Sequence, residues 1–359
     1  MKKKFAVLAA LLACLFAFAA CSSRVTVSLN RNWNINTTAA YDSAFYERLT
    51  YNVRYEEPES STLSGLKYAD VSGTYTITTE ATDYYRKISD TEDIQANQAY
   101  RLTSVLDISG RLVNENGETV YAFGGDSGNP ADSVVTTVYF RDTGDGLAPL
   151  ESTASYYSHT PAQNGSVFIY KYETKITYND DASSATVTIT DKSSEVTELD
   201  ESEAENTTVR IGVADTGESS LSSLTKNYSV FDNAQLIFAG RGLTFAADSS
   251  NTVTVVSAEG GSSNVTLSCT EVVDRTYSFN FDGNPVENAT ITTCVVNFTR
   301  SGAGSNTGPT HTVDYANRNA TVTSNTYRNM PLRIETNLSY AMGAFIYSLA
   351  DATHTAPAE

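Results

Sequence analysis

The segment Val167 to Asn179 reads VFIYKYETKITYN and decides the fold class of this chain. Successive residues of a β-strand point to opposite faces of the sheet, so the side chains divide into two sets. One set is mostly aromatic or β-branched and consists of Phe168, Tyr170, Tyr172, Thr174, Ile176 and Tyr178. The opposite set carries the charges of Lys171, Glu173 and Lys175. One apolar and one charged face indicate an antiparallel sheet that buries only one side.

The same pattern extends outward through the first half of the chain. Alternation or β-branched enrichment predicts five further strands, at Leu49 to Glu56, Gly73 to Thr79, Tyr100 to Leu112, Val134 to Arg141 and Ala185 to Asp191. Turn-forming residues separate them, as in Asn114-Glu115-Asn116-Gly117 and Asp142-Thr143-Gly144-Asp145-Gly146. These turns favour hairpins between neighbouring strands.

A short helix is predicted near residues 232–240. Asp232 is placed to cap its first turn, and Gln235 three residues later is placed to complete a capping box. Phe231 and Leu236 have the spacing of a hydrophobic staple, and Gly240 or Gly242 offers a C-terminal stop. The apolar residues of this helix are expected to pin it to the sheet.

Strands resume after the helix. The candidates are Leu243 to Ala246, Thr252 to Val256, Asn264 to Val273, Tyr277 to Phe281, Thr290 to Phe298, Thr321 to Thr323, Leu332 to Glu335 and Ala344 to Leu349. The segment Asp282-Gly283-Asn284-Pro285 is a strong turn signal. The predicted fold class is all-β with one or two short helices. We expect a large twisted antiparallel sheet, or two of them, in a half-barrel or sandwich-like arrangement.

The first 20 residues have the organisation of a secretory signal. Three lysines precede an uninterrupted apolar run from Phe5 to Ala20, which is short for a membrane-spanning helix. The junction Phe18-Ala19-Ala20-Cys21 resembles the lipobox of bacterial lipoproteins, although Leu is usual at the position of Phe18. This resemblance implies that Cys21 is acylated, with palmitate as a typical chain, and that residues 1–20 are removed. Cleavage without lipidation is the alternative.

The composition suggests three segments after the signal. Residues 21–44 are polar and rich in Asn and Thr, which predicts a linker from the membrane to the folded body. Residues 45–200 form an N-terminal antiparallel β region, and residues 201–359 form a C-terminal β region that contains the short helix. Acidic residues gather near the boundary between the two regions, from Glu195 to Glu205. A solvated loop accounts for them better than cation chelation, since the spacing of a calcium loop is missing.

The charge balance excludes one class of partner. The chain has 42 Asp and Glu against 24 Lys and Arg, for a net charge of −18. Nucleic-acid binding requires clustered cations, so nucleic acid is not an expected partner. Such a surface also repels anionic headgroups, which leaves the acyl chains to hold the protein at the membrane.

Cys269 and Cys294 are the cysteines of the predicted folded body. An exported protein can keep a disulfide, but strands two apart in a meander would hold the thiols too far apart. A single long bent strand from Asn264 to Phe281, folded back at Asp282-Gly283, would bring them together. The sequence leaves open a disulfide and two buried, inert thiols.

Catalytic and cofactor motifs are not found. The sequence contains no HExxH, CxxC, phosphate-binding loop, GxSxG or GxGxxG followed by a helix. His159 has no partner His at metal-ligand spacing and is expected in a surface turn before Pro161. We therefore predict no enzyme, no metal site and no cofactor.

Several segments resemble a group of bacterial cell-surface lipoproteins. They include the lipobox, the Thr/Tyr-rich strand Gly73 to Thr79, Ser158 to Pro161, Phe231 to Ala239, Leu332 to Thr336 and Tyr340 to Gly343. These are similar to uncharacterised lipoproteins of gut Clostridia and related Firmicutes. The resemblance implies attachment to the outer face of a Gram-positive cell membrane. The group has no established activity that could be carried over to this chain.

Two functions of different classes follow. In the first, the sheet is curved, and an aromatic face carrying Tyr170, Tyr172, Phe279 and Phe281 forms a trough for an apolar or glycan ligand. In the second, the aromatics pack against a second layer and the protein is a structural or protein-interaction module of the envelope. The oligomeric state does not follow from the sequence.

Overall fold

The computed structural model describes residues 41–58, 65–87, 93–143, 146–162, 164–197, 209–301, 309–317, 326–338 and 341–355. The predicted signal, the lipidation residue Cys21 and most of the predicted linker lie outside these residues. The acidic residues from Glu198 to Glu205 and the candidate strand Thr321 to Thr323 also lie outside them.

The described residues form one sheet of 17 strands, so the predicted all-β fold class is confirmed. The first half contributes β1 (Tyr46–Glu56), β2 (Leu66–Lys87), β3 (Asp93–Asn114), β4 (Thr119–Phe123), β5 (Asp132–Asp142), β6 (Leu147–Pro161), β7 (Val167–Tyr178) and β8 (Ala185–Asp191). The second half contributes β9 (Val209–Ile211), β10 (Gly217–Leu221), β11 (Val230–Asp232), β12 (Ser250–Val256), β13 (Ser262–Phe281), β14 (Asn284–Arg300), β15 (His311–Ala316), β16 (Pro331–Asn337) and β17 (Ala344–Thr353). Within the described residues, the helices with both ends placed are η1 (Gly125–Ser127), η2 (Ser193–Glu195), η3 (Asn233–Gln235) and α2 (Leu236–Gly240).

Antiparallel pairings connect almost the whole sheet. They run from β10 through β8, β7, β6, β5, β3 and β2 to β1. They continue from β1 through β17, β16, β15, β14 and β13 to β12. Short parallel pairings add β11 to β12, β9 to β7 and the tip of β13 to β17. The sheet is therefore mixed, and β1 joins the first and second halves of the chain.

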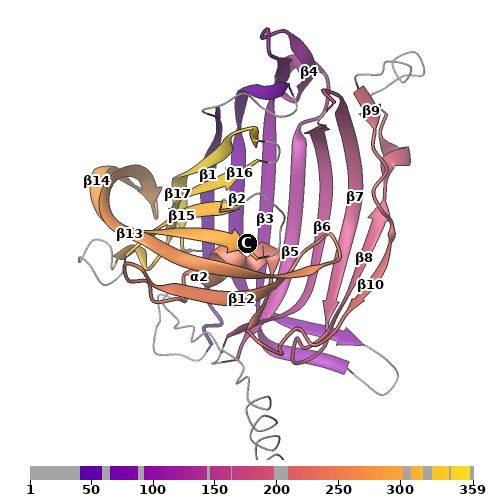
Figure 1. Cartoon of the computed structure of the whole chain (residues 1–359). Coiled ribbons are helices and arrows are strands. Elements are labelled where there is room, and N and C mark those ends of the chain that lie inside the picture. The colour runs from indigo at the N-terminus through magenta and orange to yellow at the C-terminus, as the bar shows by residue number, and fades with distance from the viewer. Residues whose placement is uncertain are drawn as a thin grey trace, which may run out of the picture.

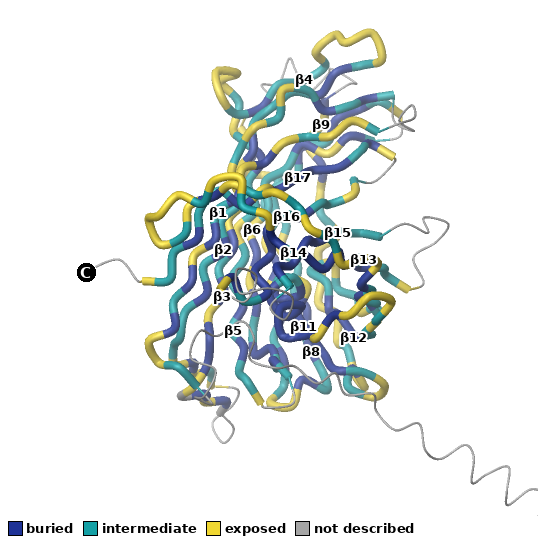
Figure 2. The backbone as a smooth tube through the Cα atoms, turned by 90° about the vertical axis from the view of Figure 1, so that its left-hand side faces the viewer, coloured by how far each residue is buried: buried dark blue, intermediate teal, exposed yellow. Residues whose placement is uncertain are grey.

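The sheet curves so that its later strands face its earlier ones. The long strands β2, β3 and β5–β8 form one broad wall, and β12–β15 cross in front of it with α2 close by (Figure 1). The ring of Phe238 in α2 lies 5.7 Å from that of Phe140 in β5. On its other side, Tyr315 of β15 donates a hydrogen bond to the carbonyl of Ile237. Helix α2 thus connects the two walls, and the buried residues concentrate in the middle of the molecule (Figure 2).

Strand β7 follows the predicted alternation over only part of its length. Toward its C-terminal end, Thr174, Ile176 and Tyr178 are buried, while Glu173 and Lys175 are exposed. At its N-terminal end the buried residues are Val167 and Ile169, which belong to the opposite face. The prediction that one face is solvent-exposed along the whole strand is therefore wrong. Ile169 lies opposite His159 of β6, which is also buried.

His159 explains this change of face, and its predicted place in a surface turn is wrong. The residue lies within β6 and is 1% exposed. Its Nδ1 lies 2.5 Å from Oδ1 of Asp132, and its ring lies 4.8 Å from that of Tyr121 and 5.1 Å from that of Phe123. Both aromatic residues come from β4, so β4 covers the outer face at this end of the sheet. The core there forms on the side that is exposed further along β7.

The predicted helix is present as η3 followed by α2. The Asp232 side chain accepts a hydrogen bond from the Ala234 backbone N–H at 2.9 Å, which confirms the predicted N-cap. The prediction of a capping box is wrong. Gln235 is buried, and its Nε2 donates a hydrogen bond to the Leu147 carbonyl of β6. The side chain of Gln235 therefore ties the helix to the sheet.

The second half contains one long strand where two were predicted. Strand β13 covers both Asn264 to Val273 and Tyr277 to Phe281, and it folds back into β14 at Asp282 and Gly283. Both turn residues have positive φ, 49° and 76°, as a two-residue hairpin requires. The predicted strand Leu243 to Ala246 is wrong, because these residues form turn and irregular structure after α2.

A buried ion pair fastens β1 to the segment after α2. Glu47 and Arg241 have side chains that are 2% and 1% exposed, and they form a two-point ion pair. His354 of the C-terminal segment adds a third partner, with its Nε2 3.2 Å from Oε2 of Glu47. Burial alone would raise the pKa of Glu47, but Arg241 and His354 hold it below its usual value. Glu47 is therefore ionised, and its charge is neutralised inside the protein.

We predict that Glu47→Gln destabilises the fold strongly. The substitution leaves Arg241 as a buried cation, which costs about 3–5 kcal/mol in the free energy of unfolding. Glu56→Gln is the control, because its pair with Arg54 is more than half exposed and is worth about 1 kcal/mol or less. Urea unfolding measures both variants, and equal losses would contradict the prediction.

Candidate functional site

The inner cavity lies between the two walls and has a volume of about 250 Å³. Its polar lining consists of Tyr75, Ser104, Thr136, Ser152, Tyr156, Thr174, Asp232, Asn233, His311, Thr336 and Tyr347. Its apolar lining consists of Leu106, Val134, Ala154, Ile176, Ala234, Leu236, Ile237, Ala258 and Ile334. Aromatic rings, aliphatic groups and inward polar groups thus line the cavity together, and pockets that combine apolar surface with positioned polar groups are the usual small-molecule sites.

Two cross-strand rows form the floor of the inner cavity, and Tyr172 and Ile77 at their ends continue the rows beyond the lining. The first row runs across β2, β3, β5, β6 and β7 through Tyr75, Leu106, Val134, Tyr156 and Tyr172. The second row runs across the same strands through Ile77, Ser104, Thr136, Ala154 and Thr174. Period-two alternation therefore supplies a floor that mixes aromatic rings, aliphatic groups and hydroxyls.

Asp232 supplies a carboxyl group at the wall of the inner cavity. Its Oδ2 accepts hydrogen bonds from Ser152 Oγ at 2.6 Å and from the Tyr178 hydroxyl at 2.7 Å. Its Oδ1 accepts the capping bond from the Ala234 backbone N–H. The residue is 2% exposed, and burial raises its pKa even though these donors lower it. The cap of a short helix thus also places an acid beside the cavity.

The opposite wall comes from the second half of the chain. His311 of β15 has its Nδ1 3.0 Å from the Thr336 hydroxyl of β16. Burial, with a contribution from the Arg300 charge, lowers the pKa of His311 to about 4. The imidazole is therefore uncharged at neutral pH. Tyr347 of β17 lines the same wall, and its ring lies 5.3 Å from that of Tyr75.

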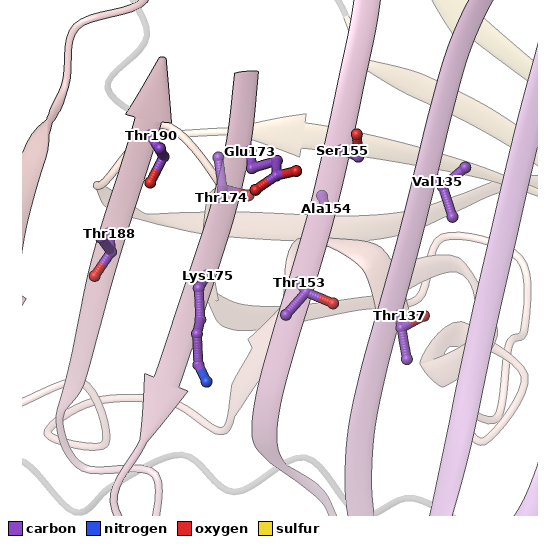
Figure 3. A pocket seen from close by; sticks show the side chains of 10 residues that line it. All are labelled: Val135, Thr137, Thr153, Ala154, Ser155, Glu173, Thr174, Lys175, Thr188 and Thr190. Carbon is purple, nitrogen blue, oxygen red and sulfur yellow. The ribbon is translucent and has the colours of Figure 1, made fainter. Parts of the chain in front are cut away.

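A second hollow lies on the outer face of β5–β8 and measures about 500 Å³ (Figure 3). Five of its ten lining residues are threonines, and the others are Val135, Ala154, Ser155, Glu173 and Lys175. The Lys175 ammonium is 3.2 Å from Glu151 and is 55% exposed. Because its charged groups are solvated at the surface, this hollow offers less discrimination between ligands than the inner cavity does.

A third hollow of about 210 Å³ lies beside the buried ion pair of Glu47 and Arg241. Its other lining residues include Phe45, Tyr327 and His354. Its charged groups already neutralise one another, since Glu47 pairs with both Arg241 and His354. We therefore assign the interactions in this hollow to stabilising the fold and not to binding a ligand.

The structure places the four predicted ligand-binding residues in two separate groups. Tyr172 stacks on Tyr156 with ring centroids 4.5 Å apart, at the edge of the inner cavity, and Tyr170 lies beside Phe168. The rings of Phe279 and Phe281 instead contact Tyr327, at 5.2 and 5.3 Å. No single trough contains all four residues.

Cys269 and Cys294 lie on paired strands, because β13 is the single long strand that would bring them together. Cys269 is opposite Val296, and Cys294 is opposite Val272, with a bulge between the two positions. The Cys269 thiol donates a hydrogen bond to the Glu271 carbonyl at 3.5 Å, and both thiols are free and buried in this structure. Burial raises the pKa of the Cys294 thiol to about 12, which makes it a poor nucleophile.

Sequence reasoning missed most of the inner cavity. Asp232 was expected only as a helix cap, and Tyr75, His311 and Tyr347 were assigned no ligand role. The alternation Ser152, Ala154, Tyr156 within β6 was a usable signal, since all three residues line the cavity. The local sequence contains no signal that predicts which distant strands, here β15–β17, lie beside these residues.

The described residues contain no group of three or more His, Cys, Asp or Glu side chains arranged to hold a metal ion. Among the helices that the structure describes, none has the length and apolar character needed to cross a bilayer.

Comparisons with known proteins give a distant structural likeness and no match in sequence. No protein-family model matches the chain, and no curated protein matches it. The fold is similar to a crystal structure from Brucella abortus, described as a beta-barrel-like protein of domain of unknown function DUF1849. The sequence identity is 8% and the TM-score is 0.46, over 87% of this chain and 98% of that chain. A likeness this weak carries no argument about function.

We predict that His311 makes the protein less stable in acid. The pKa is about 4 in the folded protein against an ordinary 6.5, so the unfolded chain takes up the proton first as pH falls. The contribution of His311 to stability is complete above pH 6.5 and is lost between 6.5 and about 4. His311→Gln removes this part of the pH dependence. Urea unfolding of both proteins across this range tests it, and parallel pH profiles would refute it.

Proposed function

We propose that this protein is a lipid-anchored extracytoplasmic binding protein that holds a small ligand in the inner cavity. The observation that carries the proposal is the cavity itself, in which an aliphatic and aromatic floor surrounds a few fixed polar groups. Ser152, Tyr178 and Ala234 hold Asp232 in one orientation through hydrogen bonds of 2.6–2.9 Å. Such preorganised polar groups orient a ligand at little entropic cost.

The size of the inner cavity limits the ligand. A volume of 250 Å³ corresponds to about eight water molecules, so a lipid or an oligosaccharide would enter only in part. A compact molecule with an apolar body and one polar end suits the lining better. The proposal includes no chemical step. Its alternative is a structural or protein-interaction module of the cell envelope that binds no ligand.

The location rests on the sequence of the first 21 residues. The basic start, the apolar run and the Ala-Ala-Cys junction support export and acylation at Cys21. The polar segment after Cys21 then gives the folded body some distance from the bilayer. A single acyl chain binds membranes only reversibly, so stable attachment implies more than one chain on this residue.

Filling the inner cavity is expected to abolish ligand binding. Leu106 belongs to the floor, whereas its neighbour Val105 is 37% exposed and points to the outer face. Leu106→Trp should therefore remove a ligand that copurifies with the protein from its own membrane, as seen by native mass spectrometry. Val105→Trp is the matched control and should keep it.

Either of two results would contradict the cavity proposal. Wild-type protein without any copurifying molecule, and without binding of a small hydrophobic dye, would favour the structural module. Equal binding by the Leu106→Trp and Val105→Trp variants would place the ligand elsewhere.

The membrane anchor is expected to depend on Cys21. In cells supplied with radiolabelled palmitate, wild-type protein should carry the label and sediment with the membranes, because acyl chains provide the attachment. Cys21→Ala should lose both properties, while Ser22→Ala, one residue further on, should keep them. A Cys21→Ala protein that remains with the membranes to the same extent would exclude this anchor.

A further inference from the structure

The inner cavity contains a carboxyl group without a cationic partner. Asp232 and His311 are the ionisable lining residues other than tyrosines, and the pKa of His311 is about 4. Within the described ranges, no Lys, Arg or His forms an ion pair with Asp232, and its three hydrogen-bond donors are neutral. This differs from Glu47, which is as deeply buried but pairs with both Arg241 and His354.

The hydrogen bonds of Asp232 leave room for one more partner. A carboxylate offers about four acceptor positions, two on each oxygen. Oδ2 uses both of its positions, on Ser152 and Tyr178. Oδ1 accepts a single bond, from Ala234. A buried carboxylate is stable only when its charge is compensated, so a cation bound in the cavity would complete the site.

Aromatic rings strengthen the preference for a cation. Tyr156 lines the cavity close enough to Asp232 that the carboxylate charge raises the pKa of its hydroxyl, after the larger effect of burial. Its ring stacks on Tyr172 with an angle of 12° between the planes. Tyr75 of the floor and Tyr347 of the opposite wall form a second pair of rings, with centroids 5.3 Å apart. The faces of such rings attract ammonium groups, most strongly where water is excluded.

The surrounding charges are unevenly distributed around the cavity. Glu259 acts electrostatically on both Tyr156 and Tyr172, which adds negative potential on the side of Asp232. Arg300 acts on His311 and lies toward the opposite wall. Because Asp232 and Tyr156 both line the cavity, the cation would sit between them, with its apolar body toward Ile237, Ile334 and Leu106.

We propose that the inner cavity binds a small organic ammonium ion, with Asp232 as its counterion and the tyrosine rings as its apolar enclosure. This inference deepens the proposed function and rests on it. The ammonium ion must fit within the cavity volume of about 250 Å³. Choline is small enough and is therefore a suitable probe. Its neutral carbon analogue, 3,3-dimethyl-1-butanol, has nearly the same shape and lacks only the charge.

Isothermal titration of the full chain in a non-ionic detergent tests the proposal. Choline should bind about tenfold or more tightly than dimethylbutanol, since a desolvated cation–π contact and a counterion both act on it. Asp232→Asn should lower the affinity for choline by a similar factor and leave the affinity for dimethylbutanol unchanged. Asp107→Asn, on the exposed outer face of β3, should change neither affinity. Glycerophosphocholine distinguishes the two sources of such a ligand. Tighter binding of glycerophosphocholine than of choline would indicate a lipid headgroup, and weaker binding would indicate a free ammonium compound.

The outcomes separate this inference from the proposed function. Equal affinity for choline and dimethylbutanol, unchanged in Asp232→Asn, would overturn the ammonium ligand and leave a cavity for neutral molecules. Failure of both choline and tetramethylammonium to bind would overturn it as well, whether or not a molecule copurifies. If Asp232→Asn does not fold, Tyr156→Leu replaces it. Loss of that ring should weaken choline more than dimethylbutanol, and equal weakening would count against the cation.

Discussion

The pairing of β1 with both β17 and β2 is the constraint on which the rest of the structure depends. Strand β1 connects the wall built by the first half of the chain to the strands of the second half. The buried pair of Glu47 and Arg241 then ties β1 to the segment after α2, and His354 ties in the end of β17. The inner cavity exists because of this connection, since Tyr75 and Tyr156 come from one half and His311 and Tyr347 from the other.

Helix α2 and the turn η3 determine that a cavity remains between the walls. Phe238 packs against Phe140, and Ile237 accepts a hydrogen bond from Tyr315, so the helix separates the walls at one point. The helix has only five residues, and the space beside it is not filled by side chains. Asp232, which caps the preceding turn η3, is held by β6 and β7 through Ser152 and Tyr178. One local feature thus spaces the walls and supplies their polar group.

The strands were predictable from the sequence because period-two alternation is local. Most long strands were found, and the positive-φ hairpin at Asp282 and Gly283 was read from turn chemistry. Which face of each strand is buried was less predictable. Strand β4 covers one end of the sheet and buries His159 on the side that is solvent-exposed elsewhere. The site was mostly missed because it depends on which distant strands meet. Phe279 and Phe281 have the same alternation as Tyr172, yet their partner is Tyr327.

The burial of Asp232 makes its proton and the proposed ammonium ion alternative partners. Burial favours the neutral acid, and the three neutral donors favour the carboxylate without fully compensating its charge. An ammonium ion in the cavity would shift this balance toward the carboxylate, because an adjacent opposite charge stabilises the ionised form. Binding would then release a proton whenever the acid is protonated in the empty cavity. The same buried group that costs stability when charged and alone would therefore give the cavity its selectivity for cations.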